Sequence, residues 1–516
     1  FFHICIVSQM REGLLRRKPG EALSHLQNKY INIFDKDRKM IEFFHEPCYT
    51  GTTFRPNHRI GEEGFMDKKH SKRSAFSGKI GFVLSAAGAS VGLGNIWRFP
   101  YIAGENGGGA FILVYIAISA LICIPIMLTE FSLGRHTRSN ALRAFRRLSP
   151  RGYWNGAGYL GIATSTIILS FYAVIAGWAL KFLQVALVNG FHRQSSEEIR
   201  TVFQQYIDHG WGPMFWTFAF IAFIAFIVVR GVEKGIEKFG KIVMPFMILL
   251  LIGLVINSLT LDGAKEGISF LLRPDFSKIN SHVILQALGQ AFFSLSLGMG
   301  TMITYGSYIP KNENMFRLAG TVAVTDTCVA ILAGLAIFPA VFSYGISPTS
   351  GPELVFITLP NVFGNMTGGY LLGIAFFFLL FTASISSSVS LLEVATLYIS
   401  EEMHLRRRTA TLIAVGTVAG LSALCLWSQA PDSSLRVAGQ NIFDLFNNAT
   451  SLYMLPLGGL LSVLFAGWVL RGRTLQEEVT SRGRYGNALF PYYRVIVRFV
   501  APVVIVLLFL SQIGVI

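Results

Sequence analysis

Apolar residues run along this chain in stretches of about 20, separated by short polar segments, from residue 77 to residue 513. A helix of about 20 apolar residues crosses the hydrocarbon core of a bilayer, which is about 30 Å thick. The pattern therefore predicts an all-α polytopic membrane protein with about eleven transmembrane helices. The spans are expected at residues 77–101, 107–133, 156–189, 213–229, 240–258, 283–308, 317–343, 367–399, 409–427, 440–469 and 494–513.

Glycine interrupts the first span near its middle, at Gly88, Gly92 and Gly94. Each glycine costs a helix interior about 1 kcal/mol relative to alanine. Backbone groups released from a helix inside hydrocarbon must find other partners, and such backbone is tolerated only where protein or a water-filled cavity surrounds it. The interruption therefore predicts a solute site at mid-membrane.

A weak internal repeat supports the same interpretation. Ser90–Asn95 in the first span resembles Ser296–Thr301 in the sixth, which is the first span of a second set of five. Because five is odd, the two sets must face opposite ways across the membrane. Paired glycine-interrupted spans indicate inverted repeats around a mid-membrane site. We expect a 5+5 inverted repeat with helices 1 and 6 broken: repeat one at about 77–258, repeat two at about 283–469 and an extra helix at about 494–513.

Lysine and arginine gather in alternate connections. Residues 68–73, 135–151, 230–241, 311–317, 406–408 and 471–494 are rich in them, whereas the intervening connections hold few. Because such loops stay on the cytoplasmic side, the N-terminus is predicted to be cytoplasmic and the C-terminus outside.

Residues 1–65 differ from the rest of the chain, since they are mixed in charge, contain Pro19, Pro47 and Pro56, and lack a long apolar run. Met66 begins a short basic lead into the first span. We expect 1–65 to be a non-native or disordered N-terminal extension of a membrane domain at 66–516. A genuine cytoplasmic domain is the alternative.

Composition narrows the class of protein. The chain has 516 residues, of which 52% are hydrophobic and 14% charged, with a mean hydropathy of +0.51. These values exclude a water-soluble enzyme. The net charge of +15 is mostly the topology pattern, and no basic stripe interleaved with aromatics indicates nucleic-acid binding. The five cysteines show no metal or disulfide spacing, and neither paired carboxylates nor a nucleophile triad indicates an enzyme.

Three motifs carry a resemblance to a known family: Gly88–Pro100, Glu105–Ala110 and Gly289–Gly298. Together they resemble the neurotransmitter:sodium symporter family, in particular its bacterial leucine and hydrophobic amino-acid transporters, and the resemblance extends from Arg73 to the C-terminus. It implies a transporter domain at 66–516 in the bacterial cytoplasmic (inner) membrane, and import coupled to two sodium ions by alternating access.

The resemblance implies a substrate site with distinct ends. Amides at Leu93 and Gly94, together with the Tyr172 hydroxyl, are expected to donate to a carboxylate. Gly92 stands where the family's monoamine carriers have an aspartate, so the substrate must bring its own carboxylate and an amino acid is favoured over an amine. The remaining implied substrate residues accept the ammonium group or contact the side chain; they are Ser90, Ile168, Phe293, Ser294, Ser296, Met299, Ser387 and Leu391.

The resemblance also implies oxygen ligands for sodium, a hard cation. The first site would use Ser90, Asn95, Ser294 and Asp326 with the substrate carboxylate. The second would use carbonyls of Gly88, Val91 and Ala383 and hydroxyls of Ser386 and Ser387. The serines at 386–388 are on their own equally consistent with close helix packing.

Span 7 departs from the family pattern, because Asp326 is followed one turn later by Ala330. An intramembrane acid is a functional hypothesis. We expect Asp326 both to bind sodium and to replace chloride, which makes chloride unnecessary. A shift of one residue, placing Thr325 at the site, is the alternative.

The resemblance also implies residues that close the site on each side, which we call gates. Arg98 and Asp444 match an outer charged pair, with Tyr172 and Phe293 as a lid. Arg73 and Glu401 match an inner pair, beside Tyr308. Of two further acids, Glu130 would cap amides of the broken sixth span or be a solvated helix-end residue, and Glu393 would join the inner network or handle protons.

The sequence thus predicts a sodium-coupled symporter that imports neutral, hydrophobic or aromatic amino acids across a lipid bilayer. An amino-acid sensor or channel, and a carrier of another zwitterion such as a betaine, are the alternatives.

Overall fold

The computed structural model describes residues 79–149, 152–208, 211–345, 347, 354–430, 433–437, 439–512 and 515. The chain divides into two units, Phe1–His70 and Ser71–Ile516. The expectation for residues 1–65 and the inner-gate residue Arg73 lie outside the described residues.

The described residues form eleven helical spans, which confirms the predicted all-α polytopic architecture. Nine described helices are continuous, long and apolar enough to span a membrane, and the other two spans are the broken ones. The first five spans are formed by α3 (Lys79–Ser90), η2 (Gly94–Arg98) and α4 (Phe99–Glu105); α5 (Gly109–Ile118), η3 (Ser119–Cys123) and α6 (Ile124–Thr137); α8 (Asn155–Leu187); α10 (Trp211–Val229); and η4 (Val232–Glu237) with α11 (Lys238–Ser258).

The second repeat and the extra helix follow the same order. They are formed by α13 (Ser281–Ser294) and α14 (Thr301–Gly306); α15 (Met315–Ser343); α17 (Gly369–Glu402); α18 (Arg407–Gln429); α19 (Ile442–Asn448), η7 (Ala449–Met454), α20 (Leu455–Leu464) and η8 (Phe465–Val469); and α22 (Phe490–Val495), η9 (Ile496–Val500) and α23 (Ala501–Gln512).

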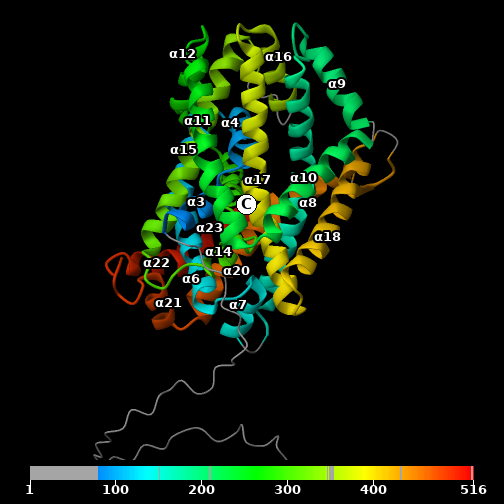
Figure 1. The fold of residues 1–516 in the computed structure, drawn as a ribbon. Coiled ribbons are helices and arrows are strands. Elements are labelled where there is room, and N and C mark those ends of the chain that lie inside the picture. The colour runs from blue at the N-terminus through cyan, green and yellow to red at the C-terminus, as the bar shows by residue number, and fades with distance from the viewer. Residues whose placement is uncertain are drawn as a thin grey trace, which may run out of the picture. The chain divides into compact units, whose positions relative to one another are not determined.

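The connections contain short elements that hydropathy does not predict. They are α7 (Ala141–Leu148), α9 (Ser196–Asp208), α12 (Ala264–Leu272), η5 (Phe276–Lys278), η6 (Leu354–Thr358), α16 (Leu359–Asn365), α21 (Gly472–Val479) and the antiparallel strands β1 (Arg436–Val437) and β2 (Gln440–Asn441). Figure 1 shows α9, α12 and α16 at one end of the bundle and α7, α21 and α22 at the other. The second end carries the arginine-rich connections, and we call it the basic end.

Side chains replace the missing helical partners at the break in span 1. The amide of Gly92 donates to Asn95 Oδ1 at 3.0 Å, and the amide of Leu93 donates to the Tyr172 hydroxyl at 2.9 Å. These contacts satisfy backbone groups that could not remain unpaired inside the membrane. They also fix the side chains of Asn95 and Tyr172 beside the break.

Left-handed backbone makes the break in span 6. Ser296, Gly298 and Gly300 have φ values of 54°, 75° and 73°. Glycine is required at 298 for a second reason, because a Cβ there would lie 2.1 Å from the Leu455 carbonyl oxygen. The Gly298 amide donates to Glu130 Oε1 at 3.0 Å, which confirms the expected capping of this break by Glu130.

Candidate functional site

A cavity of about 290 Å³ lies where the two broken spans meet α8 and α17. Ten of the eleven predicted substrate residues line it: Ser90, Gly94, Ile168, Tyr172, Phe293, Ser294, Ser296, Met299, Ser387 and Leu391. The eleventh, Leu93, lies next to it, since its amide contacts Tyr172. Residues that are far apart in sequence therefore surround one cavity.

The lining of this cavity has two chemical characters. Serine hydroxyls and the Tyr172 hydroxyl supply polar groups, whereas Ile168, Met299 and Leu391 are apolar. The Ser296 hydroxyl donates to the Ala89 carbonyl oxygen at 3.0 Å, which places it against the inner half of span 1. A pocket with convergent polar groups and an apolar wall suits a ligand with a charged end and an apolar side chain.

Asp326 is fully buried, and its carboxylate faces three hydrogen-bond donors, one from each of three other spans. Asn95 Nδ2 and Ser294 Oγ donate to Asp326 Oδ1 at 2.9 and 2.8 Å, Ser294 Oγ also lies 2.9 Å from Oδ2, and the Tyr115 hydroxyl donates to Oδ2 at 2.7 Å. Three of these residues were predicted together as the first sodium site. Tyr115 was missed, because a tyrosine in an apolar helix carries no local indication of its partner.

The oxygens in this cluster fit a sodium ion. Asn95 Nδ2 lies 3.1 Å from Ser294 Oγ and 3.0 Å from the Asp326 carbonyl oxygen, among acceptors that a small cation would also use. The two ends of a carboxamide are assigned from their hydrogen bonds. A sodium ion here would be held by oxygens of Asn95, Ser294 and Asp326.

The predicted second sodium set also comes together, on α3 and α17. The Ser386 hydroxyl donates to the carbonyl oxygens of Val91 at 3.0 Å and Ala383 at 2.9 Å. Gly88 faces the same serine, because a Cβ on it would lie 3.9 Å from Ser386 Cβ. These groups are oxygen ligands without a fixed charge, a set from which sodium could also leave.

Gly92 has no room for a side chain. A Cβ at this position would lie 1.9 Å from Ser387 Oγ and 3.1 Å from the Tyr172 hydroxyl oxygen. We expect Gly92→Ala to turn Ser387 out of place and weaken sodium-dependent substrate binding about tenfold, which corresponds to about 1.4 kcal/mol. Scintillation proximity binding on purified protein measures the affinity. Gly88→Ala is the matched control, since its Cβ meets Met244 Cγ at 3.7 Å, an ordinary contact. Equal affinities in the two variants would contradict the prediction.

On the outer side, Arg98 is buried and pairs with a residue that the sequence did not indicate. Its NH1 donates to Gln290 Oε1 at 2.7 Å, and Gln290 Nε2 donates to the Gly94 carbonyl oxygen at 3.0 Å. The guanidinium lies 4.7 Å from the centroid of the Phe293 ring. Within the described chain, no ion pair joins Arg98 to Asp444, whose carboxylate accepts from Asn441 at 2.8 Å instead.

The free-energy cost of burying charged groups explains why Arg98 contacts Gln290 and not the expected partner, Asp444. A buried ion pair must offset the desolvation of both charges, whereas the carboxamide oxygen of Gln290 accepts from Arg98 without the burial of a carboxylate. The aromatic lid does form above the cavity, since the rings of Tyr172 and Phe293 lie 6.4 Å apart.

On the inner side, Tyr308 contacts Glu393, which is fully buried. The Tyr308 hydroxyl donates to Glu393 Oε1 at 2.8 Å, and Arg407 donates to the same oxygen at 3.0 Å and pairs with Oε2. Glu393 therefore belongs to the inner network. Glu401 Oε2 accepts from the Asn140 amide at 2.8 Å and from Asn140 Nδ2 at 2.9 Å. Sequence reasoning missed Arg407 and Asn140.

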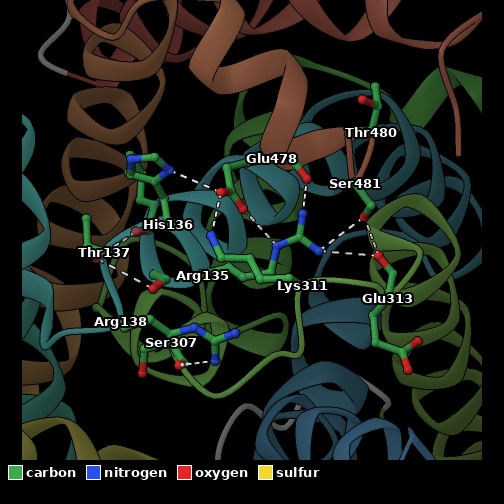
Figure 2. A network of polar contacts seen from close by, with 12 residues as sticks. Arg135, His136, Thr137, Arg138, Ser307, Lys311, Glu313, Glu478, Thr480 and Ser481 are labelled. Carbon is green, nitrogen blue, oxygen red and sulfur yellow. Dashed lines mark hydrogen bonds and ion pairs between the residues drawn. The ribbon is translucent and has the colours of Figure 1, made fainter. Parts of the chain in front are cut away.

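The sequence also provided no indication of an ionic cluster at the basic end, which Figure 2 shows. Glu478 of α21 accepts from Arg135 Nε at 3.0 Å and Lys311 Nζ at 2.6 Å, and lies 3.1 Å from His136 Nδ1. Burial raises the pKa of Glu478, but the hydrogen bonds from His136 and Lys311 and the charges of Lys311 and Arg135 hold it at about 2. The cluster ties α21 to the ends of spans 2 and 6.

Comparison with known proteins places these features in a family. The chain matches the sodium:neurotransmitter symporter family over residues 73–198 and 188–516. It is 37% identical to the uncharacterized sodium-dependent transporter YhdH of Bacillus subtilis, over 85% of this chain and 98% of YhdH. It is 34% identical to an uncharacterized sodium-dependent transporter of Haemophilus influenzae, over 87% of this chain and 100% of the relative.

A solved structure agrees in both fold and sequence. The crystal structure of MhsT in complex with L-phenylalanine superposes with a TM-score of 0.80 and 43% identity, covering 85% of this chain and 99% of MhsT. Two broken spans around a solute-sized, oxygen-lined cavity define a secondary transporter of the inverted-repeat type. The chain belongs to the sodium:neurotransmitter symporter family and is a multi-pass, sodium-dependent symporter.

Proposed function

We propose that this protein imports neutral, hydrophobic or aromatic amino acids together with sodium by alternating access. The observation that carries the proposal is the cavity at the two helix breaks, whose lining combines serine and tyrosine hydroxyls with the apolar side chains of Ile168, Met299 and Leu391. The surroundings of Gly92 support the proposal further. A Cβ at this position would lie too close to Ser387, so the aspartate that monoamine carriers have there would not fit. MhsT, which was crystallised with L-phenylalanine, is consistent with this class of substrate.

Each part of the cavity then has a role. The amide of Gly94 and the Tyr172 hydroxyl hold the substrate carboxylate, helped by the positive end of the outer half of span 1. Ser90, Ser294 and Ser296 accept from the ammonium group. Met299 is flexible and lets the pocket adapt to side chains of different shape.

Two sodium ions bind beside the substrate in this proposal. Asn95, Ser294 and Asp326 hold the first together with the Ser90 carbonyl and the substrate carboxylate; Gly88, Val91, Ala383, Ser386 and Ser387 hold the second. The Asp326 carboxylate supplies the negative charge that chloride would otherwise provide, so chloride is not required. Tyr115 positions that carboxylate through its hydrogen bond of 2.7 Å.

Alternating access requires the cavity to open to one side at a time. We propose that Tyr172, Phe293 and Arg98 close the outside in the state described here, and that Asp444 takes part when the outer side rearranges. On the inside, Tyr308, Glu393 and Arg407 form one closing contact, and Glu401 forms another with Arg73. The protein lies in a bacterial cytoplasmic membrane with its basic end facing the cytoplasm and its C-terminus outside. Residues 66–516 form the transporter domain in this proposal.

Radiolabelled uptake into proteoliposomes tests the proposed function. We expect phenylalanine or leucine to accumulate under an inward sodium gradient, and the accumulation to collapse when the gradient is removed. A panel of unlabelled competitors, including a betaine and a monoamine, defines the substrate class. Binding without accumulation would indicate a sensor, and competition by betaine alone would replace the amino-acid assignment.

A further inference from the structure

A second cavity, lined by an arginine, lies where spans 10 and 11 meet α21. Figure 1 shows α21 and α22 at the basic end. Its volume is about 280 Å³, and its walls come from η8, α21, α22 and η9. The walls combine Arg494 and Gly472 with the apolar residues Ala466, Leu470, Leu475 and Val497. The cavity is remote from the substrate site and shares no lining residue with it.

The charge in this cavity is not neutralised by the protein. Arg494 forms no ion pair with any described residue. The neighbouring acids of α21 already have partners: Glu477 pairs with Arg473 at 3.0 Å, and Glu478 pairs with Arg135 and Lys311. Because both acids pair with other basic residues and Arg494 is the charged residue in the lining, the cavity keeps a net positive charge. An anion is the ligand that this charge favours.

Gly472 brings the arginine close to the start of α21. A Cβ at Gly472 would lie 3.3 Å from Arg494 NH2, so the guanidinium lies across the first turn of this helix. No side chain caps this helix start. Its free amides add donors and partial positive charge beside the guanidinium. The cavity and its exposed arginine, which has no ion pair with any described residue, carry the argument, and the helix start adds to them.

The surroundings place the cavity at the level of lipid headgroups. Trp468, Phe499 and Tyr492 expose 56%, 51% and 71% of their surfaces next to it. The Arg498 guanidinium lies 4.3 Å from the Trp468 ring centroid, and Trp468 Nε1 donates to the Arg498 carbonyl oxygen at 3.1 Å. Amphipathic aromatic rings with adjacent arginines are typical of the membrane–water interface. Apolar residues deeper in the cavity suit the glycerol and first acyl carbons of a lipid.

We propose that this cavity binds a phosphate group, carried by the headgroup of an anionic phospholipid. Basic pockets between transmembrane helices at the cytoplasmic interface have the chemistry that recognises such headgroups. The guanidinium of Arg494 would donate two hydrogen bonds to phosphate oxygens, a geometry that arginine favours. Lipid bound there would hold span 11 and α21 against span 10.

Thermal unfolding of the full chain in neutral detergent tests the proposal, with phosphatidylglycerol, phosphatidylcholine or inorganic phosphate titrated in turn. We expect phosphatidylglycerol to raise the unfolding midpoint of the wild type, whereas phosphatidylcholine does not. Arg494→Gln should weaken the apparent affinity for phosphatidylglycerol about fivefold, the effect of one arginine near a lipid surface. Arg484→Gln, an exposed arginine of the same connection, is the matched control and should change little.

Gly472→Val provides a second variant that keeps the charge of Arg494 but fills the space beside its guanidinium. It should lose the response to phosphatidylglycerol as Arg494→Gln does. Equal weakening in Arg484→Gln would show general attraction to basic surface and overturn the site. Stabilisation of the wild type by inorganic phosphate alone, lost in Arg494→Gln, would assign the cavity to free phosphate and overturn the lipid assignment.

Discussion

Asp326→Asn is expected to lower sodium-driven uptake about a hundredfold when chloride is absent. The carboxylate of Asp326 lies within 3 Å of Ser294 and Asn95, the proposed ligands of the first sodium ion. Two opposite unit charges about 4 Å apart attract by about 4 kcal/mol at the effective dielectric of partly buried protein groups. Loss of about 3 kcal/mol of this attraction weakens sodium binding about a hundredfold.

The same substitution should make transport respond to chloride. Without the carboxylate, the hydroxyls of Tyr115 and Ser294 lose their acceptor, and an anion would restore it. We expect added chloride to recover part of the uptake of Asp326→Asn and to leave the wild type unchanged. Sodium titrations of proteoliposome uptake in gluconate and chloride buffers measure both effects.

Thr325→Ala tests whether the residue at the site is Asp326 or the threonine that precedes it. Thr325 is partly exposed and was the alternative position for the site, whereas Asp326 is fully buried in the cluster. The threonine variant should keep wild-type sodium dependence without chloride. Normal chloride-free uptake by Asp326→Asn, or its loss in Thr325→Ala, would refute the role given to Asp326.

Local sequence pattern was sufficient for the fold. Apolar runs of membrane-spanning length predicted all eleven spans, and the structure places each within a few residues of its expected bounds. The glycine-rich segments at Gly92 and Gly298 also indicated the two breaks, because glycine inside a membrane helix has a cost that local sequence reveals. The cavity lining followed from the same segments together with the family resemblance.

Partners across the fold could not be predicted in this way. Tyr115 and Gln290 lie in ordinary apolar helices, 211 and 192 positions from Asp326 and Arg98. Nothing near Tyr115 in sequence distinguishes it from a packing residue, and the Gly289–Gly298 motif that contains Gln290 does not indicate its partner. The outer pair of Arg98 and Asp444 was expected from resemblance alone, and the hydrogen bond from Arg98 to Gln290 depends on desolvation costs that appear only in three dimensions.

The short helices of the connections were missed for a different reason. They are amphipathic and too short to produce a hydropathy maximum. The sequence of α7 contains two signals that could have indicated a helix. Asn140 is its N-cap and accepts from the Arg143 amide, and Leu142 and Phe145 lie three residues apart on its buried face. α21 has the same character, with Leu475 and Val479 buried and Glu477 exposed.

Glu478→Gln is expected to lower the stability of the folded protein by about 3 kcal/mol near neutral pH. The Arg135 side chain is 1% exposed, and its ion pair with Glu478 would be lost. Removing one partner of a buried pair leaves an uncompensated charge, which costs far more than an exposed pair contributes. Glu477→Gln is the matched control on the same helix, since the pair of Glu477 with Arg473 has 51% and 91% of its side chains exposed and should matter by less than about 0.5 kcal/mol.

The difference between these two variants should depend on pH in a defined direction. The pKa of Glu478 is about 2 in the folded protein, below the value of about 4.3 for an unfolded glutamate. A depressed folded pKa stabilises the protein fully above about pH 4.3, and the contribution is lost as the pH falls toward 2. The basic groups that face the Glu478 carboxylate are Arg135, His136 and Lys311. Differential scanning fluorimetry should therefore show the midpoint gap between wild type and Glu478→Gln narrowing below pH 4.3. A gap as large in Glu477→Gln, or a gap that is constant down to pH 2, would rule out the cluster as the source of the stability.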